Sequence, residues 1–468
     1  MLLRLALRSL TTRPLRSAVL AAGFGLGIAV MVQLLGVGDV ILEQAASPAL
    51  VGGGDVVVGG AAGPIESARF VLRTLMDSPR FALRVRTASP SRRATLYLVG
   101  RGAPVAVAVR GGIPSREQAI GDPEVQTAAW RDTDADRAWI AAPPGAILRA
   151  MDRFHPVPDR PASAPADVSG WAEWLYFNGR SRDGRLRFYL SFIAGDAESG
   201  SRTVFVRLQL DRGGRIASYT AAGRAGDREL TERAPDLDVG GNRVRLVGAQ
   251  YRISLDLSPG LTGELTLDAA SGRSLPPAEI HGAGGWLSGY VVPVLAGTFH
   301  GTLTVGGERI PIENVAGYHD HNWGYWKNVR WQWGQVAYDG DPPGSAGRGV
   351  CAAGCSIVYG RVFPPADVAD ASRIPGFLGV LGPDGPIAVS TRVTITERGG
   401  GAVPTGMDVR AEGEGLSLGL SFTVNESERT ATFLQLGGTY HVSGRAGDRP
   451  LQFIARGSAE TFRADGEF

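Results

Sequence analysis

The stretch Gly317-Tyr318-His319-Asp320-His321-Asn322-Trp323-Gly324 is the most informative part of this chain. Its eight residues combine two of the six histidines with a carboxylate, an amide, a phenol and an indole. Trp326, Trp331 and Trp333 follow, so that four of the nine tryptophans fall within eleven residues. Groups that exchange protons beside aromatic faces are typical of an apolar cavity that also carries polar chemistry.

If this stretch is a strand, successive side chains point to opposite faces. The two sets that share a face are then Tyr318, Asp320 and Asn322, and His319, His321 and Trp323. Asp320 and His321 can reach one cavity only if a bulge or a strand end re-aims one of them, which Gly317 and Gly324 would permit. Three interpretations stay open: a structural polar network, an acid–base site, and a metal site built on the His319/His321 pair.

The sequence around this stretch predicts an all-β fold. From about residue 168 onward, short runs of alternating apolar residues are separated by Gly or Asp-Gly turns. Examples of such runs are 186–192, 203–208, 251–257 and 391–395. Strands at this spacing over about 300 residues predict two nearly closed barrels, which we place at 151–305 and 306–468. Eight-stranded barrels of this size can hold one small ligand.

A second constellation opens this region and reads Trp171-Ala172-Glu173-Trp174-Leu175-Tyr176-Phe177-Asn178-Gly179. On a strand, Glu173 shares a face with large apolar side chains, whereas Trp174 and Tyr176 lie on the other face. A carboxylate in such a place is either solvated or buried with a partner, because an unpaired buried charge is costly. An ion pair with a nearby arginine is the commoner explanation.

These motifs together resemble a known superfamily. Glu173-Trp174-x-Tyr176-Phe177-x-Gly179 resembles the opening motif of the AttH-like/carotenoid 1,2-hydratase (hydroxyneurosporene synthase) superfamily. The elements that are similar to its central signature are Trp286 with Tyr290 and Pro293, the 317–324 stretch, and Trp331-x-Trp333. The resemblance covers roughly residues 150–468 and implies two lipocalin-like (calycin-type) barrels with a ligand cavity near their junction. Leu175 departs from the pattern, since the family usually has a second tryptophan there.

Alkene hydration, isomerisation or cyclisation is the chemistry that this resemblance implies, on an isoprenoid or other lipid-like substrate. A buried carboxylic acid can protonate carbon, aromatic faces can stabilise the cation, and a histidine can position water. Asp320 and His321 are therefore the predicted catalytic residues. The residues predicted to bind the substrate are Glu173, Trp174, Tyr176, Trp286, Tyr318, His319, Asn322, Trp323, Trp331 and Trp333. No cofactor and no bound metal are expected.

The N-terminus predicts a membrane anchor. Residues 18–38 carry no charge, and this run is about as long as a spanning helix needs. Four arginines precede it, which places the N-terminus in the cytoplasm and the bulk of the chain outside, in the periplasm. The prediction is a basic segment at 1–16, an anchor at 17–41 that crosses the cell membrane once, and a small mixed region at 42–150. A cleaved signal peptide is the alternative.

The first sixty residues or so also resemble the start of an ABC-exporter permease of the FtsX/MacB type. Components of an ABC exporter are therefore candidate partners, and a non-catalytic lipid-binding subunit is the alternative function. Within 42–150, residues 65–76 are expected to form a helix and residues 94–99 a buried strand.

Composition excludes one class of partner. The formal net charge is only +2, and no basic groove is visible, so nucleic acid is not expected to bind. Cys351 and Cys355, the two cysteines of the chain, could close a small loop in an oxidising compartment.

Overall fold

The computed structural model describes residues 56–59, 65, 67–78, 81, 84–99, 104–127, 129–340, 349–430 and 433–462. Two compact units divide the described chain, one around residues 85–138 and one formed by residues 66–84 and 139–468. The anchor predicted at 17–41 and most of the permease-like opening lie outside the described residues. Within the ranges just given, no helix has the length and apolar character needed to cross a bilayer.

The smaller unit is a hairpin followed by short helices. Its elements are β1 (Ser91–Leu98), β2 (Val105–Gly112), α5 (Pro114–Ala119), η2 (Pro123–Val125) and α6 (Asp134–Ile140). The strand expected at 94–99 is present as β1, but every residue of β1 is exposed. Among the described residues it pairs only with β2 and is covered by no second layer, so the prediction that it is buried was wrong. Arg110 forms ion pairs with the buried side chains of Asp122 and Glu117.

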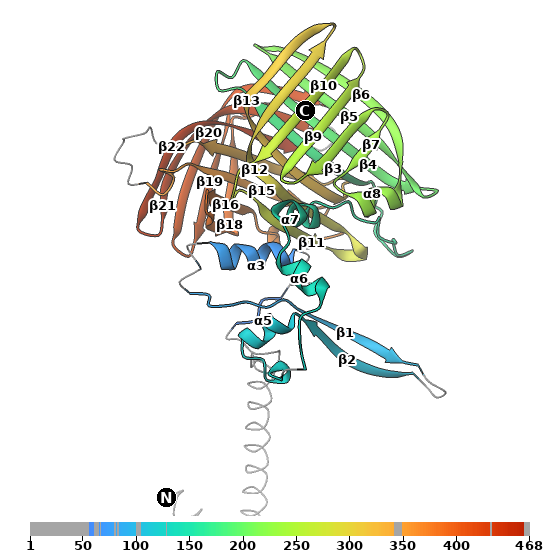
Figure 1. Ribbon diagram of the computed structural model, residues 1–468. Helices are drawn as coiled ribbons and strands as arrows, with labels where there is room; N and C mark the ends of the chain where they lie inside the picture. The colour runs from blue at the N-terminus through green and yellow to red at the C-terminus, as the bar shows by residue number, and fades with distance from the viewer. Residues whose placement is uncertain are drawn as a thin grey trace, which may run out of the picture. The chain divides into compact units, whose positions relative to one another are not determined.

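The larger unit consists mainly of strands (Figure 1). Its helices include α3 (Ala68–Asp77), α7 (Pro144–Met151), α8 (Asp227–Arg233), η3 (Ala283–Gly285) and η4 (Ala371–Arg373). Helix α3 corresponds to the helix expected at 65–76. Residues 66–84 and 139–150, which the sequence placed with the small mixed region, belong to this unit.

The first sheet is an antiparallel, nearly closed barrel. Its strands are β3 (Trp171–Arg180), β4 (Leu186–Glu198), β5 (Ser201–Arg212), β6 (Arg215–Gly226), β7 (Leu237–Val239), β8 (Asn242–Val247), β9 (Gln250–Leu257), β10 (Leu261–Ala269), β11 (Leu275–His281), β12 (Leu287–Val305) and β13 (Glu308–Tyr325). They follow the order β6-β5-β4-β3-β13-β12-β10-β9-β8-β7, with β11 paired to β12. A bridge between Thr220 of the edge strand β6 and Ser258, just beyond β9, joins this edge to the opposite end of the sheet, where β9, β8 and β7 lie.

The second sheet closes in a similar way. Its strands are β14 (Arg330–Tyr338), β15 (Cys355–Phe363), β16 (Phe377–Gly382), β17 (Gly385–Ser390), β18 (Arg392–Arg398), β19 (Gly406–Gly413), β20 (Leu416–Thr430), β21 (Phe433–Ala446) and β22 (Arg449–Phe462). Their order is β17-β16-β15-β14-β22-β21-β20-β19-β18. The edges meet where the Ser390 hydroxyl donates to the Glu412 carbonyl over 2.5 Å. A disulfide joins Cys351 to Cys355 at the start of β15.

The all-β prediction, with two lipocalin-like barrels, is thus confirmed by the two sheets. The boundary between them differs from the one expected at 305/306. Strands β12 and β13 form a hairpin in which Val305 pairs with Glu308, so β13 completes the first barrel and the second begins at β14. Gly306 and Gly307 both have positive φ and form the tight turn of this hairpin. From the sequence alone, the same two glycines had been interpreted as the start of a new domain.

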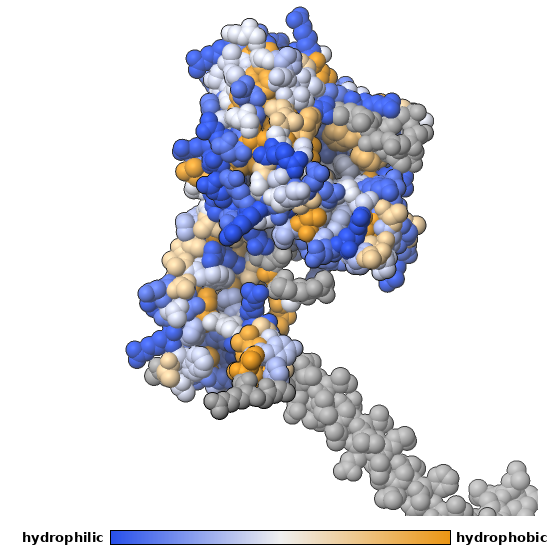
Figure 2. Space-filling model, turned by 90° about the vertical axis from the view of Figure 1, so that its right-hand side faces the viewer, coloured by the Kyte–Doolittle hydropathy of each residue, from blue (hydrophilic) through white to orange (hydrophobic). Residues whose placement is uncertain are grey.

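Three apolar clusters stabilise this unit. Large side chains fill the first barrel, among them Phe177, Phe192, Tyr251, Trp286 and Trp323. Tyr359, Phe422 and Tyr440 belong to the cluster that fills the second. A third cluster, which we call the junction, lies between the outward faces of β3, β12 and β13 and those of β14, β15 and β16; it comprises Tyr176, Val292, Leu295, Tyr318, Trp333, Val358 and Leu381. The outer surface, by contrast, is mostly hydrophilic on the face in Figure 2.

Candidate functional site

The central motif contributes to two separate places because β13 is a regular strand. Its register with β3 runs without a break from Ala316 to Tyr325. One shift in the β12–β13 pairing lies opposite Asp320, because Val291 pairs with His321 and Val294 with His319, so the extra residue belongs to β12 and not to β13. Alternation therefore holds, and no bulge re-aims Asp320 or His321. His321 packs with the residues inside the first barrel, whereas Asp320 lies with Tyr318 at the junction.

Inside the barrel, His321 is clamped between two carboxylates. Its Nδ1 lies 2.7 Å from Oδ1 of Asp152, and its Nε2 lies 3.1 Å from Oε1 of Glu173. All three side chains are fully buried. Burial favours the neutral imidazole, but the hydrogen bonds and charges of Asp152 and Glu173 outweigh it and raise the pKa of His321 to about 9. Burial would raise the pKa of both carboxyl groups, but contacts with His319 and then His321 hold the pKa of Asp152 below its ordinary value, and contacts with His155 and then His321 do the same for Glu173.

Asp152 is the centre of this network. Its Oδ2 lies 3.0 Å from Nε2 of His319 and accepts a hydrogen bond of 2.7 Å from the Tyr251 hydroxyl. Nδ1 of His319 contacts the Tyr176 carbonyl at 3.0 Å. Asp152 follows helix α7 directly, so the two histidines hold the segment that precedes the barrel inside the barrel wall. We call this set the inner network; its members are Asp152, His155, Glu173, Arg202, Tyr251, His319 and His321.

Glu173 is buried with an arginine partner, which is the commoner of the two explanations considered for it. Its Oε2 lies 3.1 Å from Nη1 of Arg202, a side chain that is itself fully buried. Its carboxylate also accepts from the backbone N–H of His155 at 2.9 and 3.0 Å. Trp323 stacks on the His155 ring at a centroid distance of 4.1 Å and donates to Glu279. Gly289 makes room for it, since a Cβ there would lie 2.0 Å from the indole.

The inner network therefore looks structural. Both nitrogens of His321 already contact acceptors, so its surroundings give no support to the predicted role in positioning water. His319 and His321, whose spacing suggested a metal site, each direct one ring nitrogen at the Asp152 carboxylate. Across the described part of the chain, no three or more His, Cys, Asp or Glu side chains are grouped so as to hold a metal ion.

At the junction, Asp320 ends a chain of hydrogen bonds. It accepts from the Tyr318 hydroxyl over 2.7 Å and from the Asn322 amide over 3.0 Å. The hydroxyls of Tyr318 and Tyr290 lie 2.8 Å apart, and the Trp333 indole donates to Tyr290 over 3.0 Å. Because Tyr318 uses its one proton on Asp320, Tyr290 must donate to Tyr318. Every donor in the chain thus points toward Asp320.

The charged state of Asp320 is disfavoured all the same. Burial raises its pKa well above the ordinary value, and the charge of Glu460 adds to this, although the hydrogen bond from Tyr318 acts the other way. Glu460 lies on β22, paired with Trp333 of β14. Burial raises its pKa to about 7, despite opposing contributions from Tyr176, Gln435 and Trp331. Two carboxyl groups that favour their protonated forms therefore lie near one another at the junction.

Aromatic rings surround these two acids. Trp333 packs against Tyr318 and Tyr176, with ring centroids 5.3 and 6.1 Å apart. Trp331 stacks on Phe462 at 4.5 Å. Trp174 contacts Trp326 at 4.6 Å and adds a further indole to this wall. Such a setting suits an apolar molecule or a cation.

The residues singled out in the sequence are thus divided between two places. Those at the junction are Trp174, Tyr176, Tyr318, Asp320, Asn322, Trp331 and Trp333. Those inside the first barrel are Glu173, Trp286, His319, His321 and Trp323. Sequence reasoning missed Asp152, His155, Arg202, Tyr251 and Gln435. Only their contacts mark them out, and no local pattern in the sequence would have found them.

The buried acids should make stability depend on pH. A carboxyl whose folded pKa exceeds its unfolded value stabilises the fold while protonated, and this contribution is lost as pH rises through the folded pKa. For Glu460 the loss should run from about pH 4.5, its ordinary pKa, to about pH 7, its folded pKa, and amount to roughly 3 kcal/mol. His321 should add a second loss between about pH 6.5 and pH 9, since its raised pKa acts in the same direction.

The measurement is the free energy of unfolding between about pH 4 and 10 for the wild type, Glu460→Gln and Glu414→Gln. Glu414 is an exposed residue on the second barrel and serves as the control. We expect Glu460→Gln to remove the fall between about pH 4.5 and 6.5 and to retain the later one, which ends near pH 9. An unchanged slope below about pH 6.5 in Glu460→Gln would contradict the assignment.

Comparisons with known proteins find a few solved structures that are similar to this chain, all at low sequence identity. No protein-family model matches this chain, and no curated protein does. A candidate AttH of Nitrosomonas europaea has 16% sequence identity and a TM-score of 0.41, and the match covers 66% of this chain and 99% of that one. CghA, alone and with Sch210972, has 13% identity and a TM-score of 0.44, over 68% of this chain and 97% of that one. Because these identities and TM-scores are low, nothing about activity follows from them.

Proposed function

We propose that this protein binds a hydrophobic, isoprenoid- or lipid-like small molecule at the junction of its two barrels and acts on an alkene there by acid catalysis. The observation that carries the proposal is Asp320: a buried carboxyl group with a raised pKa, set among indole and phenol rings. A carboxylic acid that stays protonated at neutral pH can donate a proton to a weak base such as an alkene.

The chemistry follows from the groups present. Asp320 transfers its proton to one alkene carbon and forms a C–H bond, which leaves the neighbouring carbon cationic. The faces of Trp331 and Trp333 stabilise that cation. Return of a proton from an adjacent carbon to the Asp320 carboxylate gives an isomer and restores the acid. Attack by water, followed by proton return to Asp320, gives an alcohol, and attack by a second alkene, followed by the same proton return from carbon, gives a ring.

The alternative is a lipid-binding subunit without catalytic activity that serves an ABC exporter. The permease-like opening of the sequence supports it, as does the disulfide between Cys351 and Cys355, which is typical of an oxidising compartment. Both proposals place the bulk of the chain outside the cytoplasm, held by the anchor at 17–41, and both require the same ligand site. They differ in whether Asp320 is needed for turnover.

Ligand binding itself is tested by native mass spectrometry of the purified full-length chain, followed by titration with the apolar molecule that it retains. We expect Trp331→Ala to weaken binding about tenfold or more, because a half-buried indole that a ligand covers contributes strongly to binding. Trp130→Ala is the control, since Trp130 lies on the surface of the smaller unit. Equal affinity of both variants would place the ligand elsewhere, and failure to bind any apolar molecule would refute the proposal.

A further inference from the structure

A row of polar side chains, which we call the polar stripe, runs along the junction away from Asp320 and Glu460. On β3, Tyr176, Asn178 and Arg180 share one face at alternate positions, and on β22 Arg456, Ser458 and Glu460 do the same. The two stripes lie against each other, since the Arg180 guanidinium donates to the Ser458 hydroxyl over 3.1 Å. Four residues of strand span about 13 Å, so the arginine end lies about that far from the acid end.

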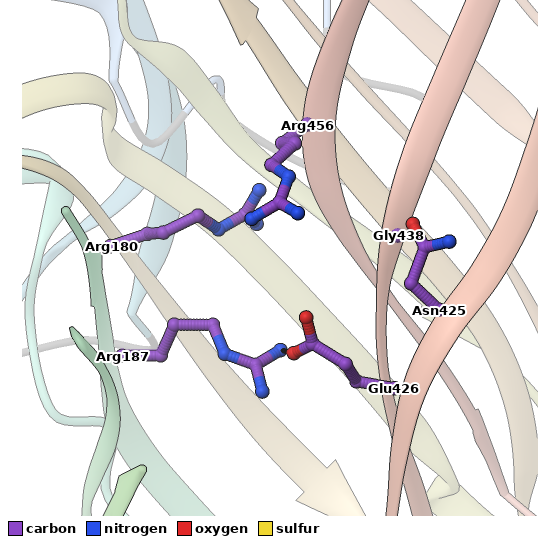
Figure 3. A pocket seen from close by; sticks show the side chains of 6 residues that line it. All are labelled: Arg180, Arg187, Asn425, Glu426, Gly438 and Arg456. Atoms are coloured by element: carbon purple, nitrogen blue, oxygen red, sulfur yellow. Dashed lines mark ion pairs between the residues drawn. The ribbon is translucent and has the colours of Figure 1, made fainter. Parts of the chain in front are cut away.

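Three guanidinium groups meet at the arginine end (Figure 3). They come from Arg180, Arg187 and Arg456, and they line a cavity of about 10 Å³, room for roughly one water molecule. The charge of Arg187 is already compensated, because it forms ion pairs with Asp211 and Glu426. It reaches the second barrel over Gly437, where a Cβ would lie 2.3 Å from its Nη1.

The other two arginines lack such partners. Within the described part of the chain, neither Arg180 nor Arg456 has a carboxylate within 4.0 Å. Burial and the charges of Arg187 and Arg456 hold the pKa of Arg180 below its ordinary value. Two unpaired guanidinium groups side by side form a fork of donors that suits a carboxylate or a phosphate. Arg456 is exposed, so such a group could enter from solvent.

An unpaired donor also lies on the path between the arginines and the acids. Asn178 is more than nine-tenths buried, yet its amide nitrogen has no hydrogen-bond partner among the described residues. Leaving a buried donor unpaired is costly, so this is independent evidence that the stripe receives something from outside the chain.

We propose that the ligand of the junction is an anionic amphiphile, whose carboxylate or phosphate head group binds Arg180 and Arg456 and whose hydrocarbon chain runs along the stripe toward Asp320 and Glu460. This inference rests on the proposed function, because it specifies the class of ligand for the same site. The head group supplies the negative charge that pairs with the two guanidinium groups, and one of its oxygens accepts from the amide of Asn178, two residues from Arg180 on the same face of β3.

The test compares a fluorescent polyene acid with its neutral ester. Purified full-length protein is titrated with cis-parinaric acid and with its methyl ester, for the wild type, Arg456→Gln and the control Arg410→Gln on the exposed face of β19. We expect the wild type and Arg410→Gln to bind the acid about tenfold or more tightly than the ester. Arg456→Gln should lose this preference and bind the ester as the wild type does.

A second variant and a competition complete the experiment. Arg180→Gln should lose the same preference, and its melting temperature shows whether it is folded. Displacement of the acid by dodecanoate or by dodecyl phosphate identifies the preferred oxyanion, and displacement by either supports the proposal. Equal affinity of the wild type for acid and ester would overturn it while leaving the proposed function intact. If neither probe binds, both the proposed function and this inference fail.

Discussion

Replacing Asp152 with asparagine should lower the free energy of unfolding by about 3–5 kcal/mol. The substitution keeps the size of the side chain but removes the charge that faces His321 and one of the two acceptor oxygens that contact His321, His319 and Tyr251. The imidazolium of His321 would then be left inside the barrel with Glu173 as its one remaining counter-charge. An uncompensated buried charge is among the most costly defects that a single substitution can create.

Urea unfolding followed by tryptophan fluorescence measures this effect. Asp268→Asn is a matched control, because Asp268 faces His300 at 3.7 Å on the surface of the same barrel, where both side chains are more than two-fifths exposed. An exposed pair of this kind contributes at most about 1 kcal/mol. If the two variants unfolded at the same urea concentration, the inner network would not be holding the segment before β3 in place.

Replacing Asp320 with asparagine should abolish turnover while leaving ligand binding nearly unchanged. An amide cannot donate a proton to carbon, and loss of a general acid costs about 10²–10⁴-fold in rate. The shape of the side chain and one of the two hydrogen bonds that it accepts, from Tyr318 or from Asn322, can be kept, so affinity for the ligand should change by no more than a few fold.

The rate is measured with the ligand that co-purifies with the full-length chain, by following loss or migration of its double bonds. Asp408→Asn, a half-exposed aspartate on β19, is the control. Activity of the wild type should also fall as pH rises, since the acid must be protonated. Unchanged turnover in Asp320→Asn would exclude Asp320 as the acid, and binding without any turnover in the wild type would favour the accessory subunit.

Much of the candidate site could be predicted from the sequence, because strand alternation is a local property. The prediction that Asp320 and His321 lie on opposite faces followed from the two-residue period and needed no knowledge of the neighbours. The expectation that Glu173 has an arginine partner rested on the cost of an unpaired buried charge, and Arg202 fills that place. In both cases a short-range physical rule limited the choices.

The partners themselves could not be predicted. Asp152 lies 167 residues from His319 and 169 from His321, and it meets them only because α7 brings the chain to the barrel interior. Glu460 joins Asp320 through the packing of the second barrel on the first. Contacts between segments so distant in sequence depend on how whole sheets pack, and the local spacing of residues in the sequence does not predict them.

The sequence alone therefore determined the all-β class, the alternation of the central strand and the division of its polar groups into two sets, since a strand exposes alternate residues whatever surrounds it. Only the tertiary structure decided which set lies inside a barrel and which lies at the junction. It also decided the protonation of each group, because desolvation and charge depend on neighbours. The pKa of His321 is raised because two carboxylates contact its ring. The pKa of Asp320 is raised because burial outweighs the hydrogen bonds that favour its charged form.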